Sequence, residues 1–227
     1  MVHYNPVQEV RKPRRDNSRS RYILEEETIP LFLAVKHSQS PYLYDLVILS
    51  LCSGMRQSEL TTATWSRYDE KNGLWILQKH EHKNNEKKVL PVTPLMRQVL
   101  ARRKAACQWT GPNDPIFPPM KEGVYRPNRA WKTAMERAGI QDFHWHDLRH
   151  TTGSWLAMAN ATHSEIMQIL GHRDPSQTAR YTHFAVRRIR ERMQELEQEH
   201  LAGALRMLGE SLASSEGDGI GGRSGIV

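Results

Sequence analysis

Residues 42–62 read YLYDLVILSLCSGMRQSELTT, and this stretch decides the fold. Apolar residues dominate positions 43–51, which predicts a buried helix over residues 42–52. Gly54 then marks the end of that helix, because glycine readily adopts the left-handed backbone conformation that closes a helix. A short second helix is expected over residues 57–62. This stretch is therefore predicted to hold a buried helix, a glycine turn and a second, shorter helix.

Arg56 follows this turn and has two interpretations. As an isolated arginine, it caps the last carbonyl groups of the helix or pairs with Glu59, three residues further on. Alternatively, Glu59 holds the guanidinium group in place for use as a binding group. We favour this supporting role for Glu59.

The remaining helices follow from apolar periodicity on both sides of this stretch. Three acidic residues at 25–27 suit the first turn of a helix, because negative charge there opposes the helix dipole. Helices are expected over residues 25–35, 94–109, 127–138, 147–159, 163–171, 176–181 and 184–209.

Two short apolar runs, residues 74–77 and 89–92, predict strands. A charged tongue, residues 79–88, separates them, so we expect an antiparallel hairpin. Pro91 lacks a backbone N–H group and therefore predicts that its strand lies at a sheet edge or ends there. The fold class is α+β: a mainly helical domain with a small antiparallel sheet.

Composition narrows the class of protein. The chain has 227 residues, a formal net charge of +7 and 38% hydrophobic residues. It contains no run of roughly 20 apolar residues and no apolar signal sequence, so we expect a cytoplasmic protein that does not enter a membrane. Two cysteines are too few for a disulfide framework. The 11 histidines lack the HExxH or cysteine-rich spacing of a zinc site, so no metal is expected.

The charge pattern predicts four segments. Residues 1–21 form a basic, proline-interrupted linker, suited to lie along a phosphate backbone or in solvent. Residues 22–183 form the main domain. Residues 184–210 form a charged helix with an apolar stripe, which packs within the domain or docks on a neighbour. Residues 211–227 are rich in glycine and serine, and we expect them to be disordered.

Two further motifs carry reactive side chains. His146 and Arg149 lie three residues apart, hence on one helical face, where both can reach one phosphate. His172 follows a Leu-Gly pair, and Tyr181 comes nine residues later between Arg180 and His183. Taken singly, these are a histidine at a helix start beside a surface ion pair, and a packed aromatic. Together they offer a cationic grip and an oxygen nucleophile.

In order and spacing these motifs resemble the tyrosine recombinase family, which includes the phage integrases. Gly-Met-Arg56-x-x-Glu-Leu resembles its first arginine motif, and His146-x-x-Arg149-His resembles its His-x-x-Arg box. Lys83 lies eight residues before Pro91, as the family's hairpin lysine precedes its Val-Pro strand. Leu-Gly-His172 and Tyr181 match the closing histidine and the nucleophile.

The resemblance implies a site-specific DNA recombinase. Tyr181 would attack a DNA phosphodiester and form a 3'-phosphotyrosyl link, without metal, ATP or cofactor. Arg56 and Arg149 would clamp the phosphate, and Lys83 would protonate the leaving 5'-oxygen. His146 would assist proton transfer, and His172 would donate a hydrogen bond. Integration or excision of a mobile element is the expected role.

Double-stranded DNA is the expected partner, and we expect a homotetramer on paired sites and association with the nucleoid. The residues predicted to contact DNA are Arg11, Lys12, Arg14, Arg15, Lys79, Lys87, Lys88 and Arg180. Family members usually carry a helical DNA-binding domain before the catalytic one. Residues 1–21 resemble the end of the linker from such a domain.

Three other functions compete with this one. A type IB topoisomerase would use the same chemistry but reseal the same strand. An integrase descendant that only binds DNA would lack the nucleophile or an arginine, and none is missing. A metal-dependent nuclease would be inhibited by chelators and would form no covalent adduct.

Overall fold

The computed structural model describes residues 21–77, 88–108, 110–119, 123–182 and 193–194. The chain divides into two compact units, residues 1–152 and residues 153–227, and each is described by itself. The basic linker up to residue 20, the tongue from residue 79 to 87, and nearly all of the predicted C-terminal helix and tail lie outside the described residues. The predicted segment boundaries stay predictions.

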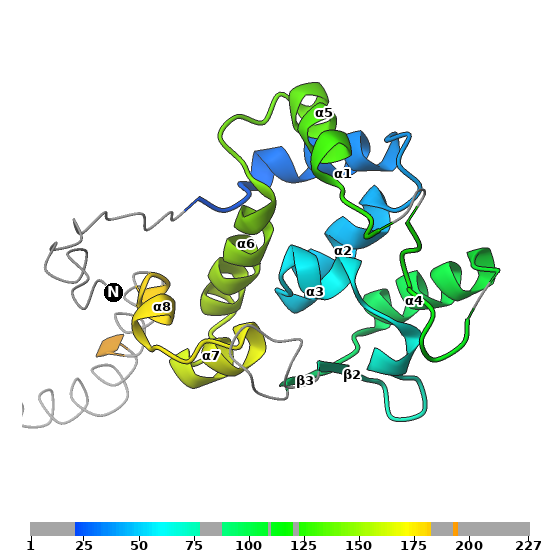
Figure 1. Cartoon of the computed structure of the whole chain (residues 1–227). Coiled ribbons are helices and arrows are strands. Elements are labelled where there is room, and N and C mark those ends of the chain that lie inside the picture. Colours follow the sequence, from blue (N-terminus) through cyan, green and yellow to red (C-terminus); the bar gives the residue numbers. More distant parts are fainter. Residues whose placement is uncertain (1–20, 78–87, 109, 120–122, 183–192, 195–227) are drawn as a thin grey trace, which may run out of the picture. The chain divides into compact units, whose positions relative to one another are not determined.

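The first unit is mainly helical, as predicted (Figure 1). Its core helix is α2 (Leu43–Ser53), in which Leu46, Val47 and Leu49 are fully buried. Three helices pack against α2: α1 (Glu25–Lys36), α3 (Gln57–Thr61) and α4 (Pro94–Ala106). Helix α1 also packs against α5 (Asn128–Ala138), and the short 3-10 helix η2 (Trp65–Arg67) leads into the sheet. The apolar run of residues 43–51 is therefore the centre of this unit.

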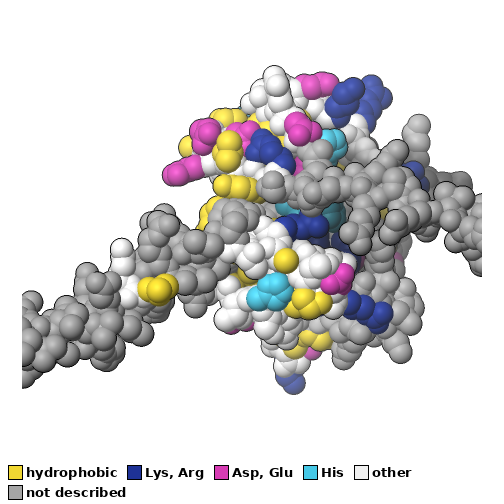
Figure 2. Space-filling model, turned by 90° about the vertical axis from the view of Figure 1, so that its left-hand side faces the viewer, with side chains coloured by type: hydrophobic (Ala, Val, Ile, Leu, Met, Phe, Trp, Pro, Cys, Tyr) yellow, Lys and Arg dark blue, Asp and Glu magenta, His cyan; other side chains and the backbone are white. Residues whose placement is uncertain are grey.

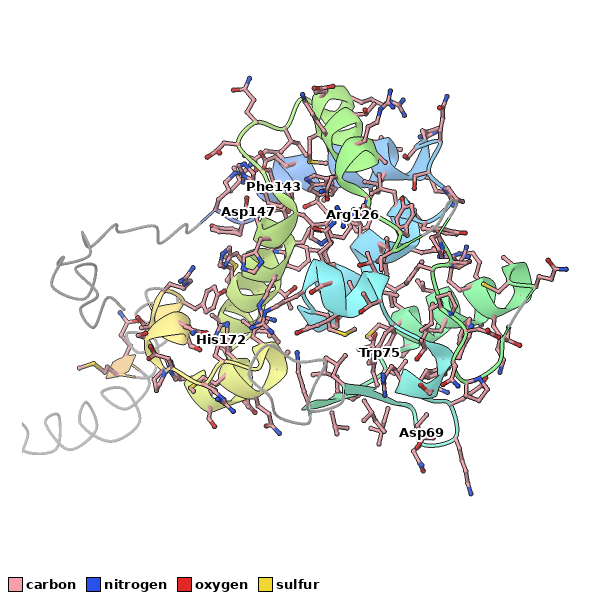
Figure 3. The ribbon with its side chains drawn as sticks, in the orientation of Figure 1. Asp69, Trp75, Arg126, Phe143, Asp147 and His172 are labelled. Atoms are coloured by element: carbon pink, nitrogen blue, oxygen red, sulfur yellow. The ribbon has the colours of Figure 1, made fainter. Side chains whose placement is uncertain are left out.

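The sheet has three antiparallel strands in the order β1 (Tyr68–Asp69), β2 (Leu74–Leu77) and β3 (Lys88–Pro91). The predicted hairpin of β2 and β3 is confirmed, and so is the edge position of the strand that contains Pro91. Strand β1 was not predicted, because two residues are too few to show an alternating pattern. Its turn is closed by Asp69, which accepts a hydrogen bond from the backbone N–H of Asn72 at 3.0 Å (Figure 3).

The hairpin register decides which side chains face the core. Trp75 pairs with Leu90 and Leu77 with Lys88, and all four are buried, whereas Val89 between them is exposed. Alternate strand residues point to opposite faces of a sheet. The register therefore places Lys88 on the same buried face as Trp75, Leu77 and Leu90.

Helix α2 ends where the sequence predicted. Gly54 adopts a left-handed conformation (φ 61°), and its N–H donates to the Ser50 carbonyl at 2.8 Å. The backbone of Arg56 is extended, and α3 begins at the next residue. The two helices are therefore separated by a three-residue turn that carries Arg56.

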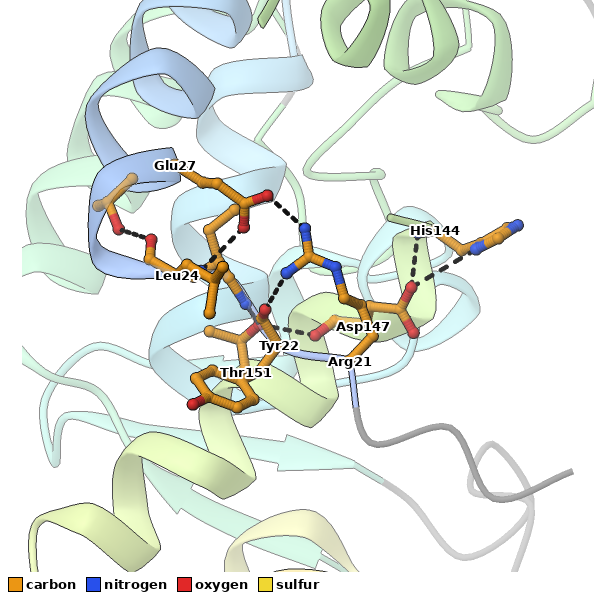
Figure 4. Close-up of polar contacts among 9 residues, drawn as sticks. Arg21, Tyr22, Leu24, Glu27, His144, Asp147 and Thr151 are labelled. Atoms are coloured by element: carbon orange, nitrogen blue, oxygen red, sulfur yellow. Dashed lines mark hydrogen bonds and ion pairs between the residues drawn. The ribbon is translucent and has the colours of Figure 1, made fainter. Parts of the chain in front are cut away.

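Helix α6 (Trp145–Met158) begins two residues earlier than predicted. The cause is Asp147, whose carboxylate accepts a hydrogen bond from the backbone N–H of His144 at 2.6 Å and so closes the first turn (Figure 4). The segment before α1 is fastened to this helix, because the N–H of Ile23 donates to the Thr151 hydroxyl at 3.0 Å. The Thr152 hydroxyl contacts the carbonyl of Leu51 at 3.0 Å. Helix α6 is thus fixed to the C-terminal end of α2.

The second unit contains the end of α6, α7 (His163–Leu170) and α8 (Ser176–Ala179). Thr162 and Glu165 form a capping box at the start of α7, and a left-handed Gly171 ends it. Its core is a small apolar cluster of Ala157, Ile166, Leu170 and Tyr181. Within the described part of the chain, no helix is both long and apolar enough to cross a membrane.

Replacement of Trp75 tests the packing of the first unit. Its side chain is fully buried on β2, so Trp75→Ala leaves a cavity. We expect the free energy of unfolding, measured in urea, to fall by about 3–5 kcal/mol. The exposed Val89→Ala on the neighbouring strand is the control and should change it by less than about 0.5 kcal/mol. Equal losses in the two variants would contradict this register.

Candidate active site

The first component of the site is the pair Arg56 and Glu59. The Arg56 guanidinium donates to Glu59 Oε1 at 2.7 Å, and the Arg56 backbone N–H donates to Oε2 at 2.8 Å. Glu59 is 4% exposed, so the carboxylate is held in the protein interior. The contact expected between these residues is present, and it fixes both the backbone and the head group of Arg56.

The second component is Arg149, which is 3% exposed. Its guanidinium donates to the backbone carbonyl of Gly54 at 2.6 Å, two residues before Arg56 and 95 residues from Arg149 in sequence. The turn after α2 therefore carries one arginine and receives the other.

Lys88 joins these groups from strand β3. It is 7% exposed, and its Nζ accordingly lies on the buried face of the hairpin. Burial, followed by the positive charge of Arg149, lowers the pKa of Lys88 to about 7; Glu59 raises it and Arg56 lowers it further. All three groups are thus close enough to Lys88 to act on it electrostatically. The predicted role of Lys88 in contacting DNA stays a prediction, but its location is interior.

Glu59 is the counter-charge of this cluster. Burial raises the pKa of its carboxyl group, but the charge of Lys88 and the hydrogen bonds from Arg56 outweigh burial, so the net shift is downward. With Glu59 as its carboxylate and Arg56 and Arg149 as permanent cations, this set of four side chains carries a formal net positive charge even with Lys88 neutral. Such a cluster is suited to bind an anion.

His146 is exposed, whereas Arg149, three residues further along α6, is buried. The His146 ring packs edge-on against His150, with centroids 4.9 Å apart. His146 is thus accessible to a ligand, and it lies in the same unit as Arg56, Glu59, Lys88 and Arg149.

In the second unit, His172 is oriented by Thr178. His172 Nδ1 lies 2.8 Å from the hydroxyl of Thr178, which is itself 1% exposed on α8. A hydroxyl that donates to Nδ1 leaves the proton on Nε2, so that nitrogen becomes a hydrogen-bond donor. Sequence analysis missed Thr178; its place three residues before Tyr181, one helical turn away, was the only available signal.

Tyr181 is 4% exposed and belongs to the apolar cluster of the second unit. Its ring packs against the backbone of α6 at Gly153. A methyl group at Gly153 would lie 2.4 Å from Cζ and 2.7 Å from the phenol oxygen. Glycine is therefore needed for this position of the ring, another feature that sequence analysis missed.

The predicted site residues are distributed as follows. Arg56, Glu59, His146 and Arg149 lie in the first unit, and His172, Arg180 and Tyr181 lie in the second. Arg180 is half-buried. The predictions that fall outside the described residues are Lys83, Arg11, Lys12, Arg14, Arg15, Lys79 and Lys87.

The described residues contain no group of three or more His, Cys, Asp or Glu side chains arranged to hold a metal ion. On the face in Figure 2, acidic side chains lie near basic and histidine side chains. The net charge of the chain therefore does not by itself locate an anion-binding surface. That inference depends on the cluster of Arg56, Glu59, Lys88 and Arg149.

The sequence is similar to those of known integrases and DNA recombinases. The model of the phage integrase family matches residues 22–188. The chain is 26% identical over 197 residues to the integrase of Salmonella phage P22, covering 83% of this chain and 50% of that protein. It is 30% identical over 182 residues to a shufflon-specific DNA recombinase of Escherichia coli, covering 79% and 44%. The chain thus spans about half the length of these relatives.

The fold is also similar to that of the catalytic domain of bacteriophage HP1 integrase. The TM-score is 0.58 at 22% identity, and the match covers 80% of this chain and 96% of that domain. At this identity the similarity concerns the fold, and it confirms the predicted mainly helical class with a small antiparallel sheet.

Neutralising Glu59 tests the charge balance of the cluster. Glu59→Gln should lower the free energy of unfolding near neutral pH by about 1–3 kcal/mol, less than for a fully buried pair because the Arg56 side chain is 20% exposed. Since the folded-state pKa of Glu59 is lowered, its contribution is present above the unfolded-state pKa, near 4.3, and is lost as pH falls through the folded value.

The measurement is urea unfolding of wild type and Glu59→Gln from about pH 7 down to about pH 3, where the difference between them should shrink. Glu70→Gln, a surface carboxylate paired with Lys104, is the control and should change stability by less than about 1 kcal/mol. A difference that grows on acidification would contradict the role of Glu59 as a buried counter-charge.

Proposed function

This chain belongs to the phage integrase family, and on that premise we propose that it carries the DNA-cleaving chemistry of a site-specific tyrosine recombinase. The observation that carries the proposal is the bond from Arg149 to the Gly54 carbonyl, which joins two arginine motifs into one cationic cluster. The similarity to a shufflon-specific DNA recombinase supports DNA as the substrate.

In the proposed reaction, Arg56 and Arg149 bind the non-bridging oxygens of one phosphodiester. Both guanidinium groups are permanently charged, and both are held by protein contacts before the substrate arrives. They therefore offset the charge that develops on the pentavalent phosphorus without having to reorganise.

The covalent step exchanges one phosphate ester for another. The Tyr181 oxygen forms a bond to phosphorus while the bond to the 5'-oxygen breaks, which gives a 3'-phosphotyrosyl link and a 5'-hydroxyl. The phenol proton passes to His146 or water, and Lys83 supplies the proton for the leaving oxygen. A 5'-hydroxyl of the partner strand then attacks the link and releases Tyr181. Because the link conserves the ester, the scheme needs neither ATP nor a metal.

His172 would donate its Nε2 proton to the same phosphate. The Thr178 hydroxyl beside Nδ1 supports this role, since it can hold the ring in the required tautomer. Thr178 is thus a positioning residue that acts through His172.

The action of the whole protein is part of the proposal. We include in it a homotetramer on paired DNA sites, action on a mobile element and a location at the nucleoid. These are properties of a whole recombinase, and the chain spans only about half the length of its relatives. Nearly all of residues 184–210, which would dock on a neighbouring subunit, lies outside the described residues. The topoisomerase and binding-only alternatives are not favoured by the family match.

Loss of the Tyr181 phenol should abolish covalent cleavage. Supercoiled plasmid, which samples many sequences, is incubated with protein in EDTA, quenched with detergent and examined for protein-linked DNA. Wild type should form the adduct and Tyr181→Phe should not. Tyr68→Phe on β1 is the control and should retain it. An equal yield of adduct with Tyr181→Phe, or wild-type cleavage that EDTA abolishes, would contradict the proposal.

Thr178→Val should slow cleavage roughly 10- to 100-fold, by analogy with loss of the hydrogen-bond partner of a functional histidine. Affinity for DNA should change little, because Thr178 is buried and does not contact the ligand. Thr178→Ser keeps the hydroxyl and should restore most of the rate. Equal rates in the Val and Ser variants would show that Thr178 acts through packing alone.

A further inference from the structure

Lys88 is in an unfavourable position for a merely structural lysine. It lies on strand β3 with its side chain on the buried face, paired in register with Leu77. Its Nζ has no hydrogen-bond partner among the described residues. A buried amine without partners destabilises the folded state, whereas a methionine of similar length would not.

The surroundings of Lys88 add to this cost. Arg149 on α6 and Arg56 before α3 both repel its positive charge, and Glu59 on α3 attracts it. The carboxylate of Glu59 already accepts two hydrogen bonds from Arg56. These four side chains therefore carry more positive than negative formal charge in the interior, and a bound anion would reduce the repulsion among them.

We propose that Lys88 is a third cationic group of the phosphate-binding site, which takes up a proton from solvent when a DNA phosphodiester binds beside Arg56 and Arg149. The inference rests on the proposed function, because it assumes that the cluster of Arg56, Glu59, Lys88 and Arg149 receives the phosphate. No covalent bond changes beyond this proton transfer: the neutral amine and one proton become an ammonium group. Its role differs from that of Lys83, the predicted proton donor to the leaving oxygen.

The uptake follows from electrostatics. In the free protein, burial and the two arginines lower the pKa of Lys88 to about 7, so the neutral amine is readily populated near neutral pH. A bound phosphodiester places a negative charge next to the cluster and raises that pKa. Lys88 is therefore protonated when the anion is bound, and it is partly neutral when the site is empty.

Stability provides the first test. Between pH 7 and the ordinary lysine value near 10.4, the unfolded chain binds more protons than the folded chain, so Lys88 destabilises the fold most at or below pH 7. Lys88→Met should therefore raise the melting temperature by about 2–8 °C at pH 7, and this gain should shrink towards pH 10. Lys132→Met, at an exposed lysine, should show no such gain.

DNA affinity provides the second test, in a Tyr181→Phe background that prevents cleavage. A fluorescent duplex of about 30 base pairs is titrated by anisotropy from about pH 7.5 to 9.5, where histidines are already neutral. With Lys88 present, the dissociation constant should rise with pH, by at most about tenfold per pH unit. In Lys88→Arg and Lys88→Met this rise of the dissociation constant with pH should be absent, and in Lys132→Met it should remain.

The outcomes separate the two proposals. If Lys88→Met gives the same pH dependence of affinity as its background and no gain in stability, Lys88 is not a proton-accepting group of the site. If DNA affinity depends on pH through Lys88 but the wild type forms no covalent adduct with plasmid, the role of Lys88 in binding phosphate is supported and the proposal of covalent cleavage is wrong. If Lys88→Arg does not fold, the comparison of Lys88→Met with its background still shows whether Lys88 takes up the proton.

Discussion

The hydrogen bond from Arg149 to the Gly54 carbonyl is the contact on which the candidate site depends. It joins α6 to the turn after α2, and these elements are 95 residues apart in sequence. The bond requires that α2 end at this carbonyl, which the left-handed Gly54 achieves, and that α6 lie beside it, which the Thr152 hydroxyl secures. With these conditions met, both arginines are held before any ligand binds, and such preorganisation is what electrostatic catalysis requires.

The apolar core makes this arrangement possible. Buried charges destabilise a fold unless other interactions offset them. Here α2 supplies stabilising apolar burial, because Leu46, Val47 and Leu49 are fully buried in a helix that packs against α1, α3 and α4, while its C-terminal end leads into the charged turn. Glu59 offsets part of the remaining repulsion, and the proposed phosphate would supply the rest. The same physical reasoning explains why Lys88 lies at a position where an apolar residue would be more stable.

Much of this could be predicted from sequence because the signals were local. Apolar periodicity and the glycine at residue 54 located α2 and its end, and the spacing of Arg56 and Glu59 indicated their contact. The burial of Lys88 could not be predicted, because it depends on the register of β3 against β2. In the sequence Lys88 belongs to the charged tongue, so the alternation of buried and exposed residues along β3 could not be recognised. Nor could the pairing of Thr178 with His172, which is set by the return of the chain after Gly171. Strand β1 carried too few residues to give a signal.

The central claim is that Arg56 and Arg149 together bind the phosphate that Tyr181 attacks. The most direct measurement is a crystal structure of the Tyr181→Phe chain bound to duplex DNA. Our account predicts that one phosphate accepts hydrogen bonds from both guanidinium groups, with the substituted ring at position 181 facing the same phosphorus, and that Arg149 keeps its bond to Gly54. A structure in which the phosphate nearest the substituted ring contacts neither arginine would contradict the account.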